Sequence, residues 1–141
     1  MGRIMAIDYG KKRVGVAVTD PLKIIANSLE TVKSSEIWNF LEDYLKNEQI
    51  ERFIVGHPRK MDGSLSESME FIKPFVNKLK KKYMEIPVEY FDERFTSKIA
   101  FQSMIDGGMK KMARRNKSMV DKISANLILQ DYLNYKKNEQ I

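Results

Sequence analysis

The chain has 141 residues, 43% of them hydrophobic, which is enough for a single domain to bury a core without disulfides or structural metal. Lysine and arginine number 25 against 19 acidic residues, and the formal charge of +6 favours an anionic partner such as nucleic acid. The absence of cysteine excludes thiol catalysis, disulfides and zinc–thiolate sites. With no secretory leader and no apolar run of membrane length, we expect a cytoplasmic protein.

The first predicted strand ends on an acid. Residues 4–7 are all apolar, as in a strand that is buried on both faces, and Asp8 follows them. A carboxylate there is costly unless it is paired or binds a metal ion, which makes Asp8 a candidate site residue, although it could equally begin a turn. After a turn at 9–12, alternating valines over 14–18 predict the second strand of a hairpin, and the small residues between them would let a helix or ligand approach.

Strand and helix patterns then alternate. The break at Asp20-Pro21 is followed by apolar residues that predict a third strand over 24–32, entered through a turn at 27–28, so the first three strands would form an antiparallel meander. From Ser34-Ser35, apolar residues recur at helical spacing as far as Leu45, and either serine is a candidate N-cap.

Two more strands are predicted. The run 52–56 follows a helix and is expected to lie parallel to its neighbour, and the run 87–91 follows a second helix over 69–82. The loop 57–64 contains the only histidine, which in such a position is more often a surface residue than a base. Its two adjacent cations could meet phosphate, because ligands gather where the strands of α/β sheets end.

The fifth predicted strand also ends in acids, Asp92 and Glu93. The alternative is a local ion network with Arg94, which is common on protein surfaces and weak. A helix is predicted to begin at Thr96 or Ser97, and the segment 109–117 after it contains five cations and no acid. Such a segment is either a solvated linker or a contact to a phosphate backbone.

A last helix is predicted from Ser118. Asp121 falls on its apolar face, where it would point toward the sheet, although Ser118 and Asp121 also have the spacing of a capping box. The remaining members of the predicted apolar face are Val120, Ala125, Leu127, Ile128 and Tyr132, and the opposing polar stripe is Lys122, Asn126 and Gln130.

This order predicts an α/β fold with a mixed five-stranded sheet, formed by the meander and two parallel strands, and helices on both faces. If the first strand is central, Asp8, the pair 92–93 and Asp121 can converge. Carboxylates this close would have raised pKa values unless divalent cations neutralised them, and oxygen ligands favour Mg²⁺ or Mn²⁺. Two ions about 3.5–4 Å apart are the usual device for phosphodiester hydrolysis.

Four motifs at residues 7–17, 55–63, 92–96 and 121–133 resemble, in this order, those of the YqgF family, also called RuvX. The family is described as Holliday junction resolvases and as nucleases that process the precursor of 16S rRNA. The resemblance implies a ribonuclease H-like fold and gives catalytic and metal-binding roles to Asp8, Glu93 and Asp121. Asp92 is the alternate ligand, because neighbours on a strand face opposite ways.

We therefore predict a divalent-metal-dependent endonuclease with Mg²⁺ or Mn²⁺, acting first on the 5′ end of precursor 16S rRNA and alternatively on branched DNA, with ribosome-assembly factors as candidate partners. A non-catalytic RNA-binding module is a further alternative. An actin-like or sugar-kinase ATPase is disfavoured, because such enzymes clamp nucleotide between two domains. The predicted nucleic-acid contacts are Lys11, Arg13, Arg59, Lys60, Arg94, Arg114, Arg115 and Lys117.

Overall fold

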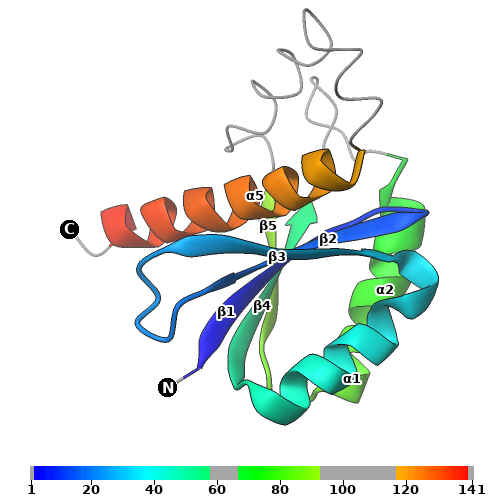
Figure 1. The fold of residues 1–141 in the computed structure, drawn as a ribbon, viewed down its shortest axis with the longest axis horizontal. Coiled ribbons are helices and arrows are strands. Elements are labelled where there is room, and N and C mark those ends of the chain that lie inside the picture. Colours follow the sequence, from blue (N-terminus) through cyan, green and yellow to red (C-terminus); the bar gives the residue numbers. More distant parts are fainter. Residues whose placement is uncertain (1, 58–66, 93–116, 140–141) are drawn as a thin grey trace, which may run out of the picture.

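The computed structural model describes residues 2–57, 67–92 and 117–139. Its centre is a five-stranded sheet with the order β3-β2-β1-β4-β5 (Figure 1). β1 pairs antiparallel with β2, and β2 with β3, whereas β1, β4 and β5 are parallel, so the predicted mixed sheet is confirmed. The strands are β1 Arg3–Tyr9, β2 Arg13–Thr19, β3 Ala26–Lys33, β4 Ile50–His57 and β5 Val88–Asp92.

One face of the sheet is covered by two helices and a short 3-10 turn. The turn Ser34–Glu36 leads into α1 (Ile37–Asn47), and α2 (Met69–Lys82) packs beside it. Alternate strand residues such as Met5 and Ile7 join the hydrophobic core of this layer. Tyr9 also faces this layer, where its ring stacks on Phe75 with centroids 4.2 Å apart.

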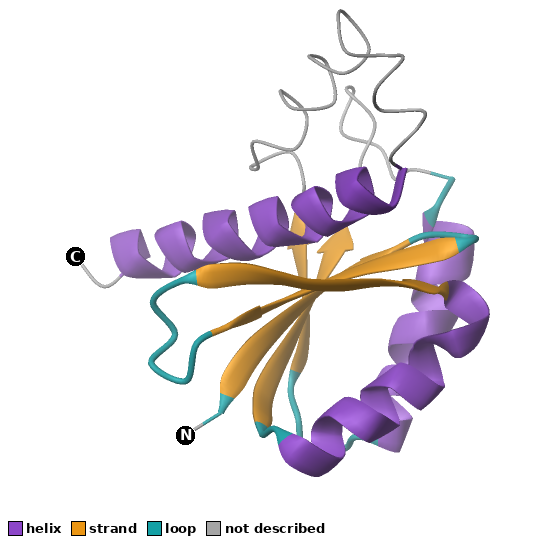
Figure 2. Cartoon of the chain, viewed as in Figure 1, coloured by secondary structure: helices purple, strands orange, loops and turns teal. Residues whose placement is uncertain are grey.

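The other face is crossed by a long helix, α5 (Lys117–Glu139), as Figure 2 shows. Small side chains make the contact: Ala6 and Ala17 on the sheet and Ala125 on the helix are all completely buried. The prediction that small residues of the second strand let a helix approach is therefore confirmed at Ala17. Neither α5 nor any other helix of the described ranges is both long and apolar enough to cross a membrane.

The third strand begins later than predicted. Ile24 and Ile25 are not in the strand but in the loop before it, with 64% and 58% of their surfaces exposed. The Asp20 carboxylate accepts hydrogen bonds from both of their backbone N–H groups at 2.8 Å, which holds the loop in shape. The predicted turn at 27–28 is wrong, because both residues lie within β3.

The first helix is also entered differently. Neither Ser34 nor Ser35 caps α1, because a 3-10 turn comes first and makes no side-chain cap bond. The Ser34 hydroxyl instead donates to the Lys11 carbonyl at 2.7 Å, and the Ser34 amide donates to the Lys12 carbonyl at 3.0 Å. The turn of the β1–β2 hairpin is thereby fastened to the end of β3.

The buried face of α5 is rotated from the predicted one. Leu129 is completely buried, whereas Leu127, which was predicted to face the core, is only partly so. Asn126, assigned to the polar stripe, approaches the sheet with its amide donating to the Ala26 carbonyl at 3.4 Å. The predicted burial of Ala125, Ile128 and Tyr132 is confirmed.

Candidate active site

Asp8 is the penultimate residue of β1, the middle strand of the sheet. Alternate residues of a strand share a face, and Ile4 and Ala6 both pack against α5, so Asp8 is on the α5 face. Asp8 pairs with Gly15 of β2. On the other side, Ile7 pairs with Val55 of β4, so the residue of β4 beside Asp8 is Gly56. The half-buried Asp8 is therefore flanked on both neighbouring strands by glycines, which place no side chain beside its carboxylate.

The tight turn beside Asp8 depends on Gly10. A Cβ atom at this position would lie 2.5 Å from the Arg13 carbonyl oxygen, so no larger residue fits without moving the hairpin. Close approach of the backbone, and not a positive φ, is the reason for glycine here. Gly10 thus keeps the end of β1, and with it Asp8, in a fixed place.

α5 runs so that its first turns lie at the Asp8 end of the sheet. Tyr132 and Leu133 line a hollow with Ile4 and Arg52, at the opposite end, where β1 and β4 begin. Asp121 precedes Tyr132 by 11 positions, or about 16 Å of helix, and Asp8 follows Ile4 by four positions, or about 13 Å of strand. Both acids are thus displaced from the hollow toward the same end; the Asp121 side chain is outside the described part of α5.

Asp92 is the last residue of β5 and lies on the face of the sheet away from Asp8. In β5, Phe91 packs against α5, and its neighbour Asp92 alternates to the other side. Asp92 pairs in register with His57, the last residue of β4, whose ring meets Tyr90 edge-on with centroids 4.8 Å apart. His57 is therefore a strand residue and not part of a loop as predicted, and Asp92 is poorly placed to join Asp8.

The remaining predicted site residues are described only in part. Lys11 is exposed in the hairpin turn and Arg13 begins β2. Lys117 begins α5, but its side chain is not described. Within the described residues, no group of three acidic, histidine or cysteine side chains could hold a metal ion. Outside the described residues are Glu93, Arg59, Lys60, Arg94, Arg114 and Arg115.

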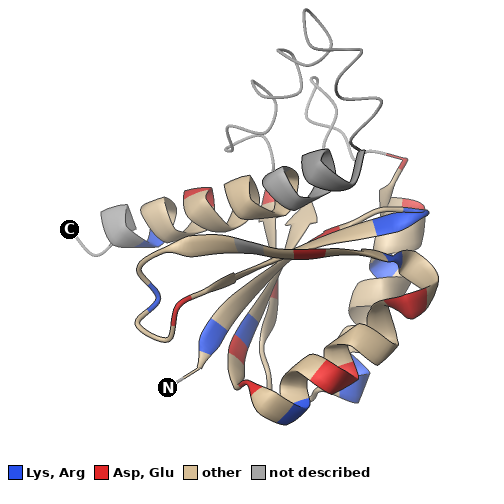
Figure 3. Cartoon of the chain, in the orientation of Figure 1, with Lys and Arg blue, Asp and Glu red and all other residues tan. Residues whose placement is uncertain are grey.

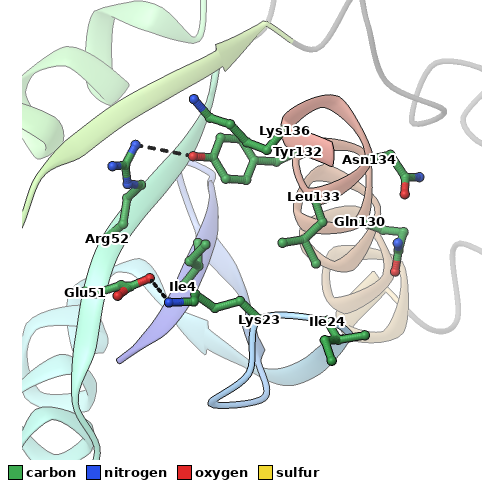
Figure 4. Close-up of a pocket in the computed structure, with 10 residues that line it drawn as sticks. All are labelled: Ile4, Lys23, Ile24, Glu51, Arg52, Gln130, Tyr132, Leu133, Asn134 and Lys136. Atoms are coloured by element: carbon green, nitrogen blue, oxygen red, sulfur yellow. Dashed lines mark hydrogen bonds and ion pairs between the residues drawn. The ribbon is translucent and has the colours of Figure 1, made fainter. Parts of the chain in front are cut away.

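A polar network fastens α5 to the sheet at the end away from Asp8 (Figure 4). Tyr132 donates to a Glu89 carboxylate oxygen at 3.1 Å and accepts a 3.4 Å hydrogen bond from Arg52, which also pairs with Glu89. Burial, and then the nearby Glu89 charge, raise the pKa of Tyr132 to about 12. Arg52 and Tyr132 line the hollow of about 690 Å³, and no sequence pattern had singled out these two residues and Glu89 as a group.

Tyr132→Phe is expected to lower the free energy of unfolding by about 1–2 kcal/mol at pH 8, because a hydrogen bond to a charged group is lost. The native pKa of about 12 exceeds the unfolded value of 10, so above pH 10 only the unfolded chain releases this proton. The stabilisation is complete below pH 10 and is lost as the pH rises through 12. Urea titrations of both proteins across this range should show their difference shrinking, since the other tyrosines cancel; a constant difference would contradict the network.

Comparison with known proteins decides the family. The family model described as "RuvX: Holliday junction resolvase" matches residues 2–135. The chain belongs to the RuvX family. Relatives within the RuvX family named "Putative pre-16S rRNA nuclease" include one from Phocaeicola vulgatus, 58% identical over 97% of this chain and 99% of its own. Another, from Christiangramia forsetii, is 57% identical over 94% of this chain and 98% of its own.

Solved structures place the RuvX-family chain in a known fold. The structure described as "T. thermophilus RuvC in complex with Holliday junction substrate" superposes with a TM-score of 0.52, over 96% of this chain and 97% of that one. The two sequences are 15% identical, so the likeness concerns the fold alone. The predicted ribonuclease H-like fold is thereby confirmed.

Proposed function

We propose that this protein is a divalent-metal-dependent endonuclease that hydrolyses phosphodiester bonds, with the 5′ end of precursor 16S rRNA as its first candidate substrate. The observation that carries the proposal is the position of Asp8. In a RuvX-family chain, it lies at the end of the central strand, between two glycine positions, and on the face that α5 covers. This arrangement supports a ligand site at Asp8, because neither flanking glycine places a side chain beside its carboxylate.

Asp8, Glu93 and Asp121 are the proposed ligands for Mg²⁺ or Mn²⁺. The Asp8 carboxylate fits such an ion, because it is a hard oxygen donor and its flanking glycine positions leave space for further ligands. The placement of Asp92 on the opposite face supports Glu93 as the second ligand. Asp121 precedes the buried Ala125 by four positions, or about one helical turn, so the two positions belong to one row of α5. When bound, the ions would activate water and stabilise the leaving oxygen.

The cations near this end of the sheet would bind the substrate backbone. Lys11 lies in the exposed turn after β1, three positions from Asp8, and its backbone is fastened by Ser34. Arg94 is proposed to orient the scissile phosphate, with Arg114 and Arg115 as further backbone contacts. The net charge of +6 supports an anionic macromolecular substrate.

Branched DNA is the second candidate substrate. The description of the matching family as a Holliday junction resolvase favours it. The names of the curated relatives favour RNA instead. Both substrates present the same phosphodiester chemistry to the proposed carboxylates, so the two candidates share one site and differ in the shape of the nucleic acid that the surface accepts.

Removing the metal is expected to abolish cleavage. A fragment carrying the 5′ end of precursor 16S rRNA and a four-way DNA junction would each be incubated with the protein and Mg²⁺, Mn²⁺ or a chelator. We expect cutting of the RNA with either ion, slower or no cutting of the junction, and none with the chelator. Cutting that persists in the chelator would overturn the metal dependence, and RNA binding without any cutting would favour the non-catalytic RNA-binding alternative.

A further inference from the structure

A basic groove of about 500 Å³ lies where the β1–β2 hairpin meets the end of the edge strand β3. The basic segments of the hairpin turn and of the end of β3 come together at this end of the sheet (Figure 3). We call it the edge groove; its lining residues are Lys12, Arg13, Thr31, Val32 and Lys33. Neither Lys12 nor Lys33 stood out in the sequence, because the pairing of β2 with β3 brings them together.

The edge groove is on the same face of the sheet as Asp8. Gly15 of β2 pairs with Asp8 on one side and with Thr31 on the other, so the three positions form one row across the sheet. Arg13 pairs with Lys33, two residues further toward the hairpin, and strand alternation keeps this pair on the face of the row. Gly15 adds no side chain to this row.

Two like charges directly opposite each other on neighbouring strands are unfavourable in themselves. Arg13 and Lys33 occupy such positions, and Lys12 adds a third cation from the turn. The Ser34 hydrogen bonds to the backbone of Lys11 and Lys12 hold this turn against the end of β3, so the cations are brought together before any ligand arrives. An anion bound in the edge groove would meet positive charge from both the hairpin and β3.

The spacing fits a nucleic-acid strand that extends from the cleavage site. Two strand spacings separate Asp8 from Thr31, about 10 Å, and Lys33 lies about 7 Å further along its strand. The Cα atoms of Asp8 and Lys33 are therefore about 12 Å apart across the sheet, or about three to four nucleotides of a base-stacked helical strand, which rises about 3.4 Å per nucleotide along its axis.

We infer that the edge groove binds the phosphate backbone of the substrate strand about three to four nucleotides from the cleaved bond. Lys12, Arg13 and Lys33 supply the charge, and the Thr31 hydroxyl can donate a hydrogen bond to a phosphate oxygen. The inference rests on the proposed function for its direction, because the strand must pass over Asp8 to reach the groove. These contacts are with the backbone, so they position the substrate without selecting bases.

The test is RNA binding by fluorescence anisotropy in chelator, over a range of salt concentrations, with the precursor fragment as probe. For Lys12→Gln combined with Lys33→Gln, we expect about tenfold weaker binding. The plot of log affinity against log salt concentration should also become less steep, by about 1.5 in the magnitude of its slope. In cleavage with Mg²⁺, KM should rise while kcat stays within about twofold. The matched control is Lys80→Gln combined with Lys81→Gln, an equal charge change at the exposed end of α2.

Shortening the RNA locates the contact. RNA fragments would be trimmed stepwise on one side of the cut or on the other. On one side, wild type and the groove variant should bind with the same affinity once fewer than about three nucleotides remain. Trimming on the other side should leave their difference in affinity unchanged. If the groove variant matches the α2 control while the wild type binds and cuts, the edge groove is overturned and the nuclease stands. If the wild type binds RNA but never cuts it, the proposed nuclease function is overturned. The change in salt dependence then still shows whether the edge groove binds RNA. If the wild type does not bind, both are overturned.

Discussion

Asp8→Asn is expected to slow phosphodiester cleavage on the order of 10³-fold, equivalent to about 4 kcal/mol of transition-state stabilisation. The amide has the shape of the carboxylate but no charge, so it is a poor ligand for a hard divalent cation. The half-buried position opposite Gly15 accepts the amide without a clash, so the fold should be retained. Single-turnover cleavage rates with Mg²⁺, measured beside thermal unfolding, check both expectations.

The matched control for this variant is Asp43→Asn, the same chemical change on an exposed side chain of α1 in the opposite layer. It should cut at the wild-type rate. Binding of RNA by the Asp8 variant in chelator should be as tight as wild type or slightly tighter, since a negative charge is removed near the backbone. If Asp8→Asn and Asp121→Asn both cut as fast as wild type, the active site lies elsewhere.

Leu129→Ala is expected to lower the free energy of unfolding by about 2–5 kcal/mol, the usual range for truncating a fully buried leucine. Leu127→Ala, two residues earlier on the same helix, should cost less than about 1.5 kcal/mol, because Leu127 is only partly buried. Chemical denaturation of the two variants and wild type measures both values. The sequence pattern predicted Leu127 in the core, so equal losses, or a larger loss at Leu127, would restore the predicted helix face and contradict the structure.

Much of the fold was predictable because its strands carry strong local patterns. β1 is apolar on both faces since both layers of helices bury it, and a run such as 4–7 indicates this directly. The late start of β3 was missed for a reason of chemistry. Ile24 and Ile25 have the composition of a strand, but the Asp20 carboxylate competes for their backbone N–H groups and keeps them in a loop.

The face of α5 could not be predicted reliably, since its apolar residues are spread around the helix. Only the sheet decides which of them are buried. The small side chains of Ala6 and Ala17 allow α5 to approach the sheet closely. Ala125 and Leu129 are buried in this contact, and Leu127 is not. Asn126 can then reach the Ala26 carbonyl, which a helical wheel does not reveal.

The candidate site was predictable to the extent that it depends on single strands. Asp8 stands at the end of β1 as predicted, whereas its catalytic role stays a prediction. The sequence alone could not decide between Asp92 and Glu93 as the ligand, because it does not show which face of the sheet each residue is on. The packing of Phe91 against α5 places its neighbour Asp92 on the opposite face. The edge groove was not predictable, since Arg13 and Lys33 are 20 positions apart in sequence and meet only through strand pairing.

The proposed site combines residues from nearly opposite ends of the sequence. Asp8 belongs to the first strand, and Asp121, 113 positions later, belongs to the last helix. During translation the hairpin emerges first and α5 emerges last. An incomplete chain on the ribosome therefore lacks a ligand for the ions, whatever has already folded. If the proposed ligands hold the ions, the site is complete only when synthesis of the chain is nearly finished.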